Sequence, residues 1–157
     1  MIPEKVKTVL DDNNLRAVEF EEGSTPTAQS ASLKFGVKVG QIAKSLLFLG
    51  KNGRFYLVVC PGDRKVSGSK LKQAAGVKTR LANADETFRE TEFLPGGVCP
   101  FGIEGIDIFL DEQLKIYDTI YPAAGTNSSG VPMTFEQLAA ITKGKICDLT
   151  VPFETKM

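Results

Sequence analysis

The sequence predicts a single domain of the α+β class, in which short helices and short strands are mixed without regular alternation. The chain has 157 residues, which is a usual length for one domain. Its apolar runs are short and are separated by turns rich in Gly, Pro and Asn, with several hairpins, whereas a doubly wound parallel sheet needs strands and helices in strict alternation. No internal repeat, linker or low-complexity tract divides the chain, so we expect the domain to span residues 1–157.

The expected elements follow from capping residues, turn residues and apolar spacing. In order they are a helix from Pro3 that ends at 11–14, a strand at 15–21, a helix at 28–35 between Thr27 and Gly36, strands at 45–49 and 55–60, a helix from Ser67 or Ser69 to Gly76, a strand at 79–82, a helix at 84–91, strands at 106–110 and 114–120, a helix from Thr134, and a strand at 145–150.

The strongest local signal is a β-hairpin. Residues 45–49 and 55–60 are two apolar runs, and the five residues between them contain Asn52-Gly53. Asn-Gly between apolar runs is a strong hairpin signal because both residues tolerate the positive φ angles of a tight turn. Pro61 then ends the second strand, since proline has no N–H to donate to a sheet.

Histidine is absent from the chain, and this excludes several catalytic classes. Ser-His-Asp and Cys-His hydrolysis, HExxH zinc sites and histidine proton shuttles all need an imidazole. The three cysteines, Cys60, Cys99 and Cys147, form no CxxC pair, so we expect neither a metal site nor a disulfide framework. No cofactor is expected, and proton chemistry must come from other side chains, from water or from the substrate.

The charge balance and the hydropathy limit the partners. Lys plus Arg and Asp plus Glu each number 19, so the formal net charge is zero. A neutral total does not favour non-specific binding along DNA, although it leaves room for a local basic patch. The longest apolar stretch, 55–60, is far shorter than the about 20 residues that cross a bilayer, and the first residues lack the apolar core of a signal peptide. We therefore expect a cytoplasmic protein with no membrane partner.

The residues themselves single out Lys44 and the loop at 96–100 as candidate site residues. Lys44 directly precedes the apolar run 45–49, where a lysine is unusual unless its ammonium reaches water or an anion. The glycines of the loop allow a close approach of the main chain to a ligand. Each feature has an ordinary alternative, a surface lysine and a tight turn. Cys99 has no nearby base in sequence to lower its pKa and is expected to be inert. A polar loop that can bind a polar ligand or satisfy itself contains Gly125, Asn127 and Ser128.

Two segments resemble the signatures of one family of editing domains. The segment that begins at Thr27-Ala28 and ends in Gln41-Ile42-Ala43-Lys44-Ser45-Leu46-Leu47-Phe48 resembles the first signature of the YbaK family, also called the prolyl-tRNA synthetase-associated or INS-like editing domain. Gly96-Gly97-Val98-Cys99-Pro100 matches its second signature, a GxxxP loop. The segments at 62–66 and 134–138 fall where the family has its middle and C-terminal segments, so the resemblance covers nearly the whole chain.

The resemblance implies a mixed, barrel-like β-sheet flanked by short helices and the activity of a free-standing aminoacyl-tRNA deacylase. It implies that Lys44 is the essential lysine, whose ammonium contacts the aminoacyl-adenosine end, and that main-chain amides of residues 96–100 lie near the ester carbonyl. Ser45 would be a small polar pocket residue, with Phe20 and Thr25 as candidates for the pocket wall. The implied partner is mischarged tRNA bound by its acceptor end, most typically tRNA for proline carrying alanine or cysteine. A prolyl-tRNA synthetase is a further candidate partner.

The chemistry of the implied substrate agrees with the lack of histidine. An aminoacyl ester is already activated, so water assisted by the ribose hydroxyl, Lys44 and main-chain amides would hydrolyse it without a metal or an acyl-enzyme. Two other functions stay open: a non-catalytic module that binds tRNA or a synthetase, and hydrolysis of another small activated ester. The presence of both Lys44 and the GxxxP loop favours the deacylase. Contacts with tRNA would be local, through Lys34, Lys38, Lys65, Lys70 and Lys72.

Overall fold

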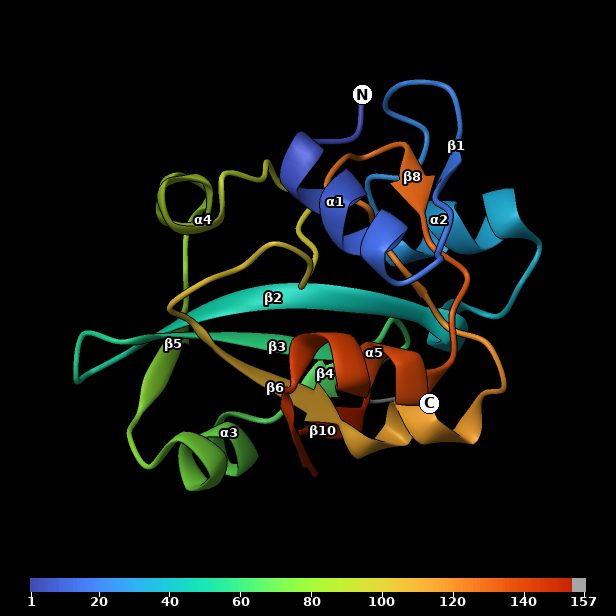
Figure 1. Ribbon diagram of the computed structural model, residues 1–157. Coiled ribbons are helices and arrows are strands. Elements are labelled where there is room, and N and C mark those ends of the chain that lie inside the picture. The colour runs from blue at the N-terminus through green and yellow to red at the C-terminus, as the bar shows by residue number, and fades with distance from the viewer. Residues whose placement is uncertain (154–157) are drawn as a thin grey trace.

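A computed structural model of the protein describes residues 1–153 (Figure 1). Its elements are α1 (Glu4–Asp12), β1 (Val18–Glu19), α2 (Ala28–Phe35), the 3-10 helix η1 (Val39–Gln41), β2 (Ile42–Gly50), β3 (Phe55–Pro61), β4 (Arg64–Val66), α3 (Gly68–Ala75), β5 (Thr79–Leu81), α4 (Ala84–Thr91), β6 (Asp107–Asp111), the 3-10 helix η2 (Glu112–Ile116), β7 (Tyr121–Pro122), β8 (Ser129–Gly130), α5 (Phe135–Thr142), β9 (Lys145–Cys147) and β10 (Thr150–Pro152).

The main sheet is mixed, which confirms the α+β class. Its strands follow the order β5-β2-β3-β6-β9, and β7 pairs with β2 outside this path. The predicted hairpin is confirmed, because β2 and β3 pair antiparallel from Ala43↔Pro61 to Leu49↔Phe55. β6 is parallel to β3, and β9 is parallel to β6. Two small sheets pair β1 with β8 and β10 with β4. Over residues 1–153 the main sheet stays open and does not close into a barrel.

Capping residues set the helix boundaries where the sequence predicts them. The Thr27 side chain accepts a hydrogen bond from Ser30 N at the start of α2, and Gly36 ends that helix with a φ of 69°. α3 begins after Ser67 and ends at Gly76, and α5 begins after Thr134. The predicted bounds of α2 and α4 match those of the structure. Local capping signals are reliable here because each cap satisfies main-chain groups of its own helix.

The prediction of a strand at 114–120 is wrong. Residues 112–116 form η2, which connects β6 to β7. The apolar residues of this segment do not alternate as a strand requires, since Leu114 is fully buried whereas Ile116 is 69% exposed. The predicted final strand at 145–150 is in fact two strands in different sheets, β9 and β10, and the predicted strand at 15–21 is reduced to β1.

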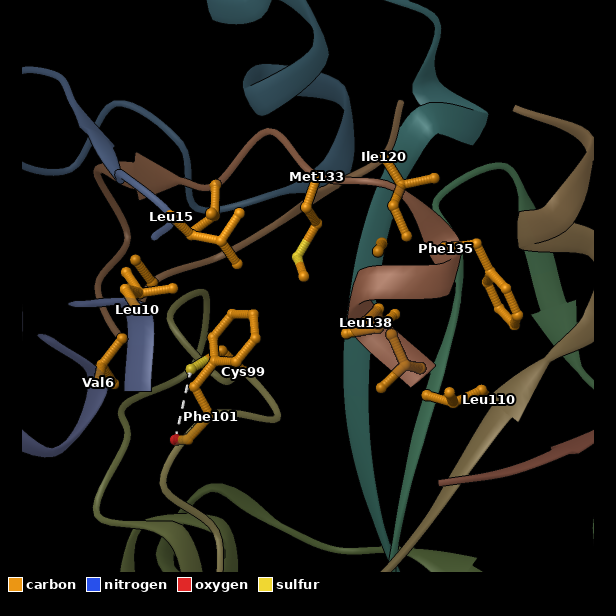
Figure 2. Close-up of a cluster of buried hydrophobic side chains, with 14 of the residues drawn as sticks. Val6, Leu10, Leu15, Cys99, Phe101, Leu110, Ile120, Met133, Phe135 and Leu138 are labelled. Carbon is orange, nitrogen blue, oxygen red and sulfur yellow. Dashed lines mark hydrogen bonds between the residues drawn. The ribbon is translucent and has the colours of Figure 1, made fainter. Parts of the chain in front are cut away.

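Both faces of the main sheet are covered, so β3 is buried on both sides. One face packs against a large apolar cluster to which α1 contributes Val6 and Leu10 and α5 contributes Leu138 (Figure 2). The other face packs against α3 through Leu71, in a cluster that includes Cys60. Figure 1 shows α1 and α2 on one side of the sheet and α3 on the other. Within residues 1–153 no helix combines the length and apolarity that a membrane span needs.

A buried hydrogen-bond network joins β6, β10 and β4 on the α3 side of the sheet. Asp111 is fully buried, and its carboxylate accepts hydrogen bonds from Leu149 N at 3.0 Å and from Thr150 Oγ1 at 2.6 Å. Thr150 Oγ1 in turn accepts from Arg64 Nε at 2.7 Å. The carbonyl oxygen of Arg64 accepts a hydrogen bond from Lys44 Nζ at 2.8 Å, so the network ends at β2.

We expect Asp111→Ala to lower the free energy of unfolding by about 3 kcal/mol, because it leaves buried donors of Leu149 and Thr150 without an acceptor. Urea denaturation of the variant and the parent protein measures this difference. Asp148→Ala is the matched control, since Asp148 is half-exposed and, among residues 1–153, forms an ion pair only with Lys70, at 2.9 Å. It should cost less than about 1 kcal/mol. Equal losses in the two variants would contradict the assigned role of Asp111.

Candidate active site

A cavity of about 420 Å³ lies between α2, β2, the start of α4 and the loop at 95–98. Its walls are mainly apolar: α2 contributes Ala28, Ala31 and Phe35, and β2 contributes Ala43 and Leu47. Of the lining residues within the described range 1–153, Lys44 alone is charged. The cavity size is within the range of small-molecule sites, roughly 300–1,000 Å³.

The edge of β2 is open where it lines the cavity. One edge of β2 pairs with β3 along almost the whole strand. The other edge pairs with β7 only at Ile42 and Ala43, and with β5 only at Phe48–Gly50. Residues 44–47 lie between these two pairings, so no strand within residues 1–153 covers this edge of them. The cavity is therefore lined by residues whose side chains lie on opposite faces of β2, Lys44 and Leu46 on one face and Ser45 and Leu47 on the other.

Two buried hydroxyl groups in the cavity lining have no hydrogen-bond partner within the described part of the chain. They are Thr25 Oγ1 and Ser45 Oγ, on residues that are 5% and 9% exposed. A buried hydroxyl without a partner costs about 1–3 kcal/mol, so such groups are uncommon in folded proteins. Their place in the lining of an otherwise apolar cavity indicates a site for a ligand with a polar group.

The glycines of the loop at 96–100 allow a close approach between segments. Gly96 has a φ of 86°, and a Cβ atom added there would lie 3.1 Å from the main chain of Pro26. A Cβ atom added at Gly97 would lie 2.8–2.9 Å from main-chain atoms of Thr126, which is closer than real Cβ atoms approach. The packing therefore requires glycine at both positions. It holds the loop against the wall of the cavity, where Gly96 and Val98 contribute to the lining.

Lys44 lines the cavity, but its ammonium group is directed away from it. In the β2–β3 ladder Lys44 lies opposite Cys60, on the α3 face, whereas the neighbouring Ser45 side chain lies on the cavity face. Nζ donates its hydrogen bond to the carbonyl of Arg64 and lies 5.2 Å from the ring centroid of Phe153. Lys44 thus reaches the cavity only with part of its side chain, while its ammonium belongs to the hydrogen-bond network that continues through Arg64 and Thr150 to Asp111.

Cys99 and Pro100 are buried and do not line the cavity. The Cys99 thiol packs in the large apolar cluster, with Sγ 4.0 Å from the carbonyl oxygen of Phe101 (Figure 2). Burial away from water raises the pKa of the Cys99 thiol to about 12. The thiol is therefore protonated at neutral pH and lacks the thiolate that a cysteine nucleophile needs.

We expect Cys99→Ser to retain catalytic activity within about threefold, because a protonated, buried thiol does not act as a nucleophile. The pH–rate profile of the parent protein should show no ionisation of Cys99 up to about pH 9, given a thiol pKa of about 12. Initial rates of ester hydrolysis from pH 6 to pH 9 measure both points. An acyl adduct on Cys99, found by mass spectrometry during turnover, would contradict this prediction.

The other predicted site residues lie around a second hollow. It is lined by Phe20, Gly97, Gly125, Asn127 and Ser128, together with three acidic residues, Glu19, Glu22 and Glu92. Asn127 serves its own loop, since its Oδ1 accepts from Gly23 N at 3.2 Å and its carbonyl accepts from Thr25 N at 2.7 Å. Phe20 packs edge-to-face on Phe35, with ring centroids 5.0 Å apart. The structure thus separates these five residues from the lining shared by Lys44, Ser45 and Thr25.

Several cavity residues were not predicted from the sequence. Phe35 of α2 is one, although its spacing from Ala28 and Ala31 marks one apolar face of the helix. Thr87 of α4 is another. α4 is held in place by Glu86, which accepts two hydrogen bonds of 2.8 Å from Arg80. These bonds, followed by one from the Asn83 main chain, lower the pKa of Glu86 to about 2, so the pair stays ionised at neutral pH.

Comparison with known proteins identifies the family. A sequence model described as the aminoacyl-tRNA editing domain matches residues 22–141, which include the cavity residues and the loop at 96–100. The chain belongs to the aminoacyl-tRNA editing domain family. Among residues 1–153 of this editing domain, no group of three or more Cys, Asp or Glu side chains is placed to hold a metal ion.

Relatives of this editing domain have been named in several bacteria. YwhH of Bacillus subtilis is 36% identical over 129 residues, which are 82% of each chain, and is uncharacterized. EbsC of Enterococcus faecalis, which is named for deacylation of Cys-tRNA(Pro) and Cys-tRNA(Cys), is 25% identical over 126 residues, 79% of this chain and 77% of EbsC. A crystal structure assigned to a trans-editing enzyme for prolyl tRNA synthetase superposes with a TM-score of 0.86 at 31% identity, over 96% of this chain and 99% of that one.

Proposed function

We propose that this editing domain hydrolyses the ester bond of mischarged aminoacyl-tRNA, with alanine or cysteine on tRNA for proline as the leading substrates. The observation that carries the proposal is the cavity between the GxxxP loop and the open edge of β2, which has a size and a polarity suited to one aminoacyl group. The names of EbsC and of the trans-editing enzyme support the same reaction.

The lining of the cavity favours a small, uncharged amino acid. Among residues 1–153 its walls carry no carboxylate and no guanidinium, so the side chain of an acidic or basic amino acid would be buried there without a partner. The hydroxyls of Thr25 and Ser45 can pair with one polar group of a substrate. A hydrophobic pocket distinguishes one methylene group by only about 1–3 kcal/mol, so alanine, cysteine and serine are close competitors.

The reaction needs orientation more than it needs a nucleophilic side chain. Water attacks the ester carbonyl carbon, the bond to the ribose oxygen breaks, and the proton from the attacking water passes to that ribose oxygen, which leaves as a hydroxyl group. Holding the water, the ester and the neighbouring ribose hydroxyl together removes several kcal/mol from the barrier. Main-chain amides of the Gly96–Pro100 loop would stabilise the oxyanion, at roughly 2.7–4 kcal/mol for each donor.

The acceptor end of the tRNA would enter beside the start of β2. Lys34 and Lys38 are exposed there, and Lys44 lies at the open edge of the strand. Cations at this end of the cavity suit the phosphates of the terminal nucleotides, since lysine binds phosphate as a point charge. A prolyl-tRNA synthetase is the partner that would produce the mischarged substrate.

A deacylation panel tests the proposal. Purified protein is incubated with tRNA for proline charged with alanine, cysteine, serine or proline, and loss of the labelled amino acid is followed against the uncatalysed rate. We expect at least one of the first three esters to be hydrolysed much faster than the prolyl ester. Binding of these tRNAs without turnover would overturn the deacylase and would support a non-catalytic tRNA-binding module of the same fold.

A further inference from the structure

The main-chain groups of Ser45 face the open part of the β2 edge. The carbonyl of Ile42 accepts from Gly62 N at 2.8 Å on the β3 side, and the carbonyl of Leu47 accepts from Ala82 N at 2.8 Å on the opposite side. In an antiparallel ladder the N–H and C=O of one residue point the same way, and successive residues alternate. The N–H and C=O of Ser45 therefore point to the Leu47 side, where neither β7 nor β5 reaches them in the described chain.

We propose that the aminoacyl group of the substrate binds at this edge by pairing with Ser45, in the way that one residue of an antiparallel strand would. This inference rests on the proposed function and names how its substrate is held. The α-amino group donates to the Ser45 carbonyl oxygen, and the ester carbonyl oxygen accepts from the Ser45 N–H. These are the two hydrogen bonds that directly opposite residues exchange in an antiparallel pair. The N–H bond strengthens as the ester oxygen becomes an oxyanion.

The open part of the edge has room for one residue. The residues of β2 that face this edge are Ala43, Ser45 and Leu47, and consecutive ones are about 7 Å apart along a strand. β7 pairs at Ala43, and Ala82 binds the carbonyl of Leu47. A single aminoacyl unit fits between them, whereas a peptide extended beyond its α-amino group would collide with the segment that contains Ala82. The site therefore selects aminoacyl esters over peptidyl esters.

The antiparallel direction also fixes where the side chain and the ribose of the substrate lie. Side chains of directly opposite residues lie on the same face of a sheet, so the substrate side chain lies beside that of Ser45, in the cavity lined by Thr25 and Val98. The ester oxygen then points toward the start of β2. Because β7 pairs there with Ile42 and Ala43, the ribose leaves the plane of the sheet beside Lys44. A D-amino acid making the same two hydrogen bonds would direct its side chain to the opposite face, away from the apolar walls.

Amide hydrogen exchange tests the proposal on the folded protein. The probe is 3′-(L-alanylamino)-3′-deoxyadenosine, whose amide link is not hydrolysed as the ester is, and exchange is followed residue by residue by NMR. We expect the Ser45 amide to exchange rapidly in the free protein and at least about tenfold more slowly with saturating probe. The Leu46 amide faces β3 and is the internal control, whose exchange rate should not change.

Two analogues of the probe give a binding control. The D-alanyl and propionyl analogues should bind at least about tenfold more weakly, because each loses a contact that the L-alanyl group makes.

The outcomes separate this inference from the proposed function. An L-alanyl probe that fails to bind, that binds without slowing exchange at Ser45, or that binds no better than its D-alanyl or propionyl analogue overturns the inference, whatever the deacylation panel shows. Absence of turnover on every charged tRNA overturns the proposed function instead.

A pair of variants adds a kinetic test. Ser45→Pro removes the N–H that faces the open edge, where a proline is compatible with an edge strand, and Ser45→Ala removes only the hydroxyl. We expect kcat/KM of Ser45→Pro to be about 100-fold below that of Ser45→Ala, since one oxyanion donor contributes a factor of that order. Equal values in the two variants would overturn the role of the N–H. If Ser45→Pro fails to fold, as judged by thermal unfolding, the exchange measurement decides.

Discussion

Lys44→Met is expected to lower kcat/KM for the mischarged tRNA about 100-fold, which corresponds to about 2.7 kcal/mol of lost transition-state stabilisation. Methionine keeps the length of the apolar stem and removes the charge. Lys44 lies in the open part of β2 and lines the cavity, while its ammonium makes one hydrogen bond, to the Arg64 carbonyl. A rotation of the side chain can exchange that single bond for a contact with a phosphate of the substrate. Initial-rate kinetics at several substrate concentrations measure the loss.

Two further variants distinguish a substrate contact from a structural role for Lys44. Lys44→Arg keeps the charge and should recover most of the activity, while Lys51→Ala removes an exposed lysine of the turn between β2 and β3 and should change kcat/KM by less than about threefold. If Lys44→Met keeps full activity but lowers the melting temperature, Lys44 serves only to tie β2 to β4. That result would refute its place in the reaction.

Gly97→Ala is expected to lower the free energy of unfolding by about 2–3 kcal/mol and kcat/KM by about 100-fold. The added Cβ would lie 2.8–2.9 Å from the main chain of Thr126, and a main chain cannot move aside as the end of a flexible side chain can. The loop must then shift, which displaces Gly96 and Val98 in the wall of the cavity. Urea denaturation and deacylation rates on the same preparation measure the two effects.

Gly68→Ala is the matched control for this substitution. Gly68 is the first residue of α3, and nothing lies within 4 Å of a Cβ added there. Alanine is favoured over glycine in helices, so the control should leave activity unchanged and the free energy of unfolding equal or slightly higher. A Gly97→Ala variant as stable and active as Gly68→Ala would show that the contact with Thr126 is not required.

The fold could be predicted where local signals decide the structure. Thr27 and Gly36 bound α2 because a cap satisfies the helix's own main chain, and Asn52-Gly53 specifies the β2–β3 hairpin through its turn. The strands β4, β7 and β8 were missed, since each has only two or three residues and exists because a distant segment pairs with it. η2 was misassigned for the same reason: contacts with the core, not local alternation, bury Leu114.

The candidate site was only partly predictable for a related reason. The resemblance points to Lys44, Ser45, Thr25 and Gly96, and the structure brings all of them to the lining of one cavity. Alternation along a strand already predicts opposite faces for the side chains of Lys44 and Ser45. The contact of Gly97 with Thr126 joins residues far apart in sequence and carries no local signal, and the same holds for the separation of Asn127 and Ser128 into the second hollow.

The short length of the open β2 edge also bears on solubility. An unpaired strand edge usually invites the strand of another molecule to join it, which leads to aggregation. Here β7 and β5 flank the gap closely, so a neighbouring protein cannot add a strand of ordinary length. This part of β2 can thus offer bare main-chain groups to a small ester while remaining protected from pairing with a strand of another molecule.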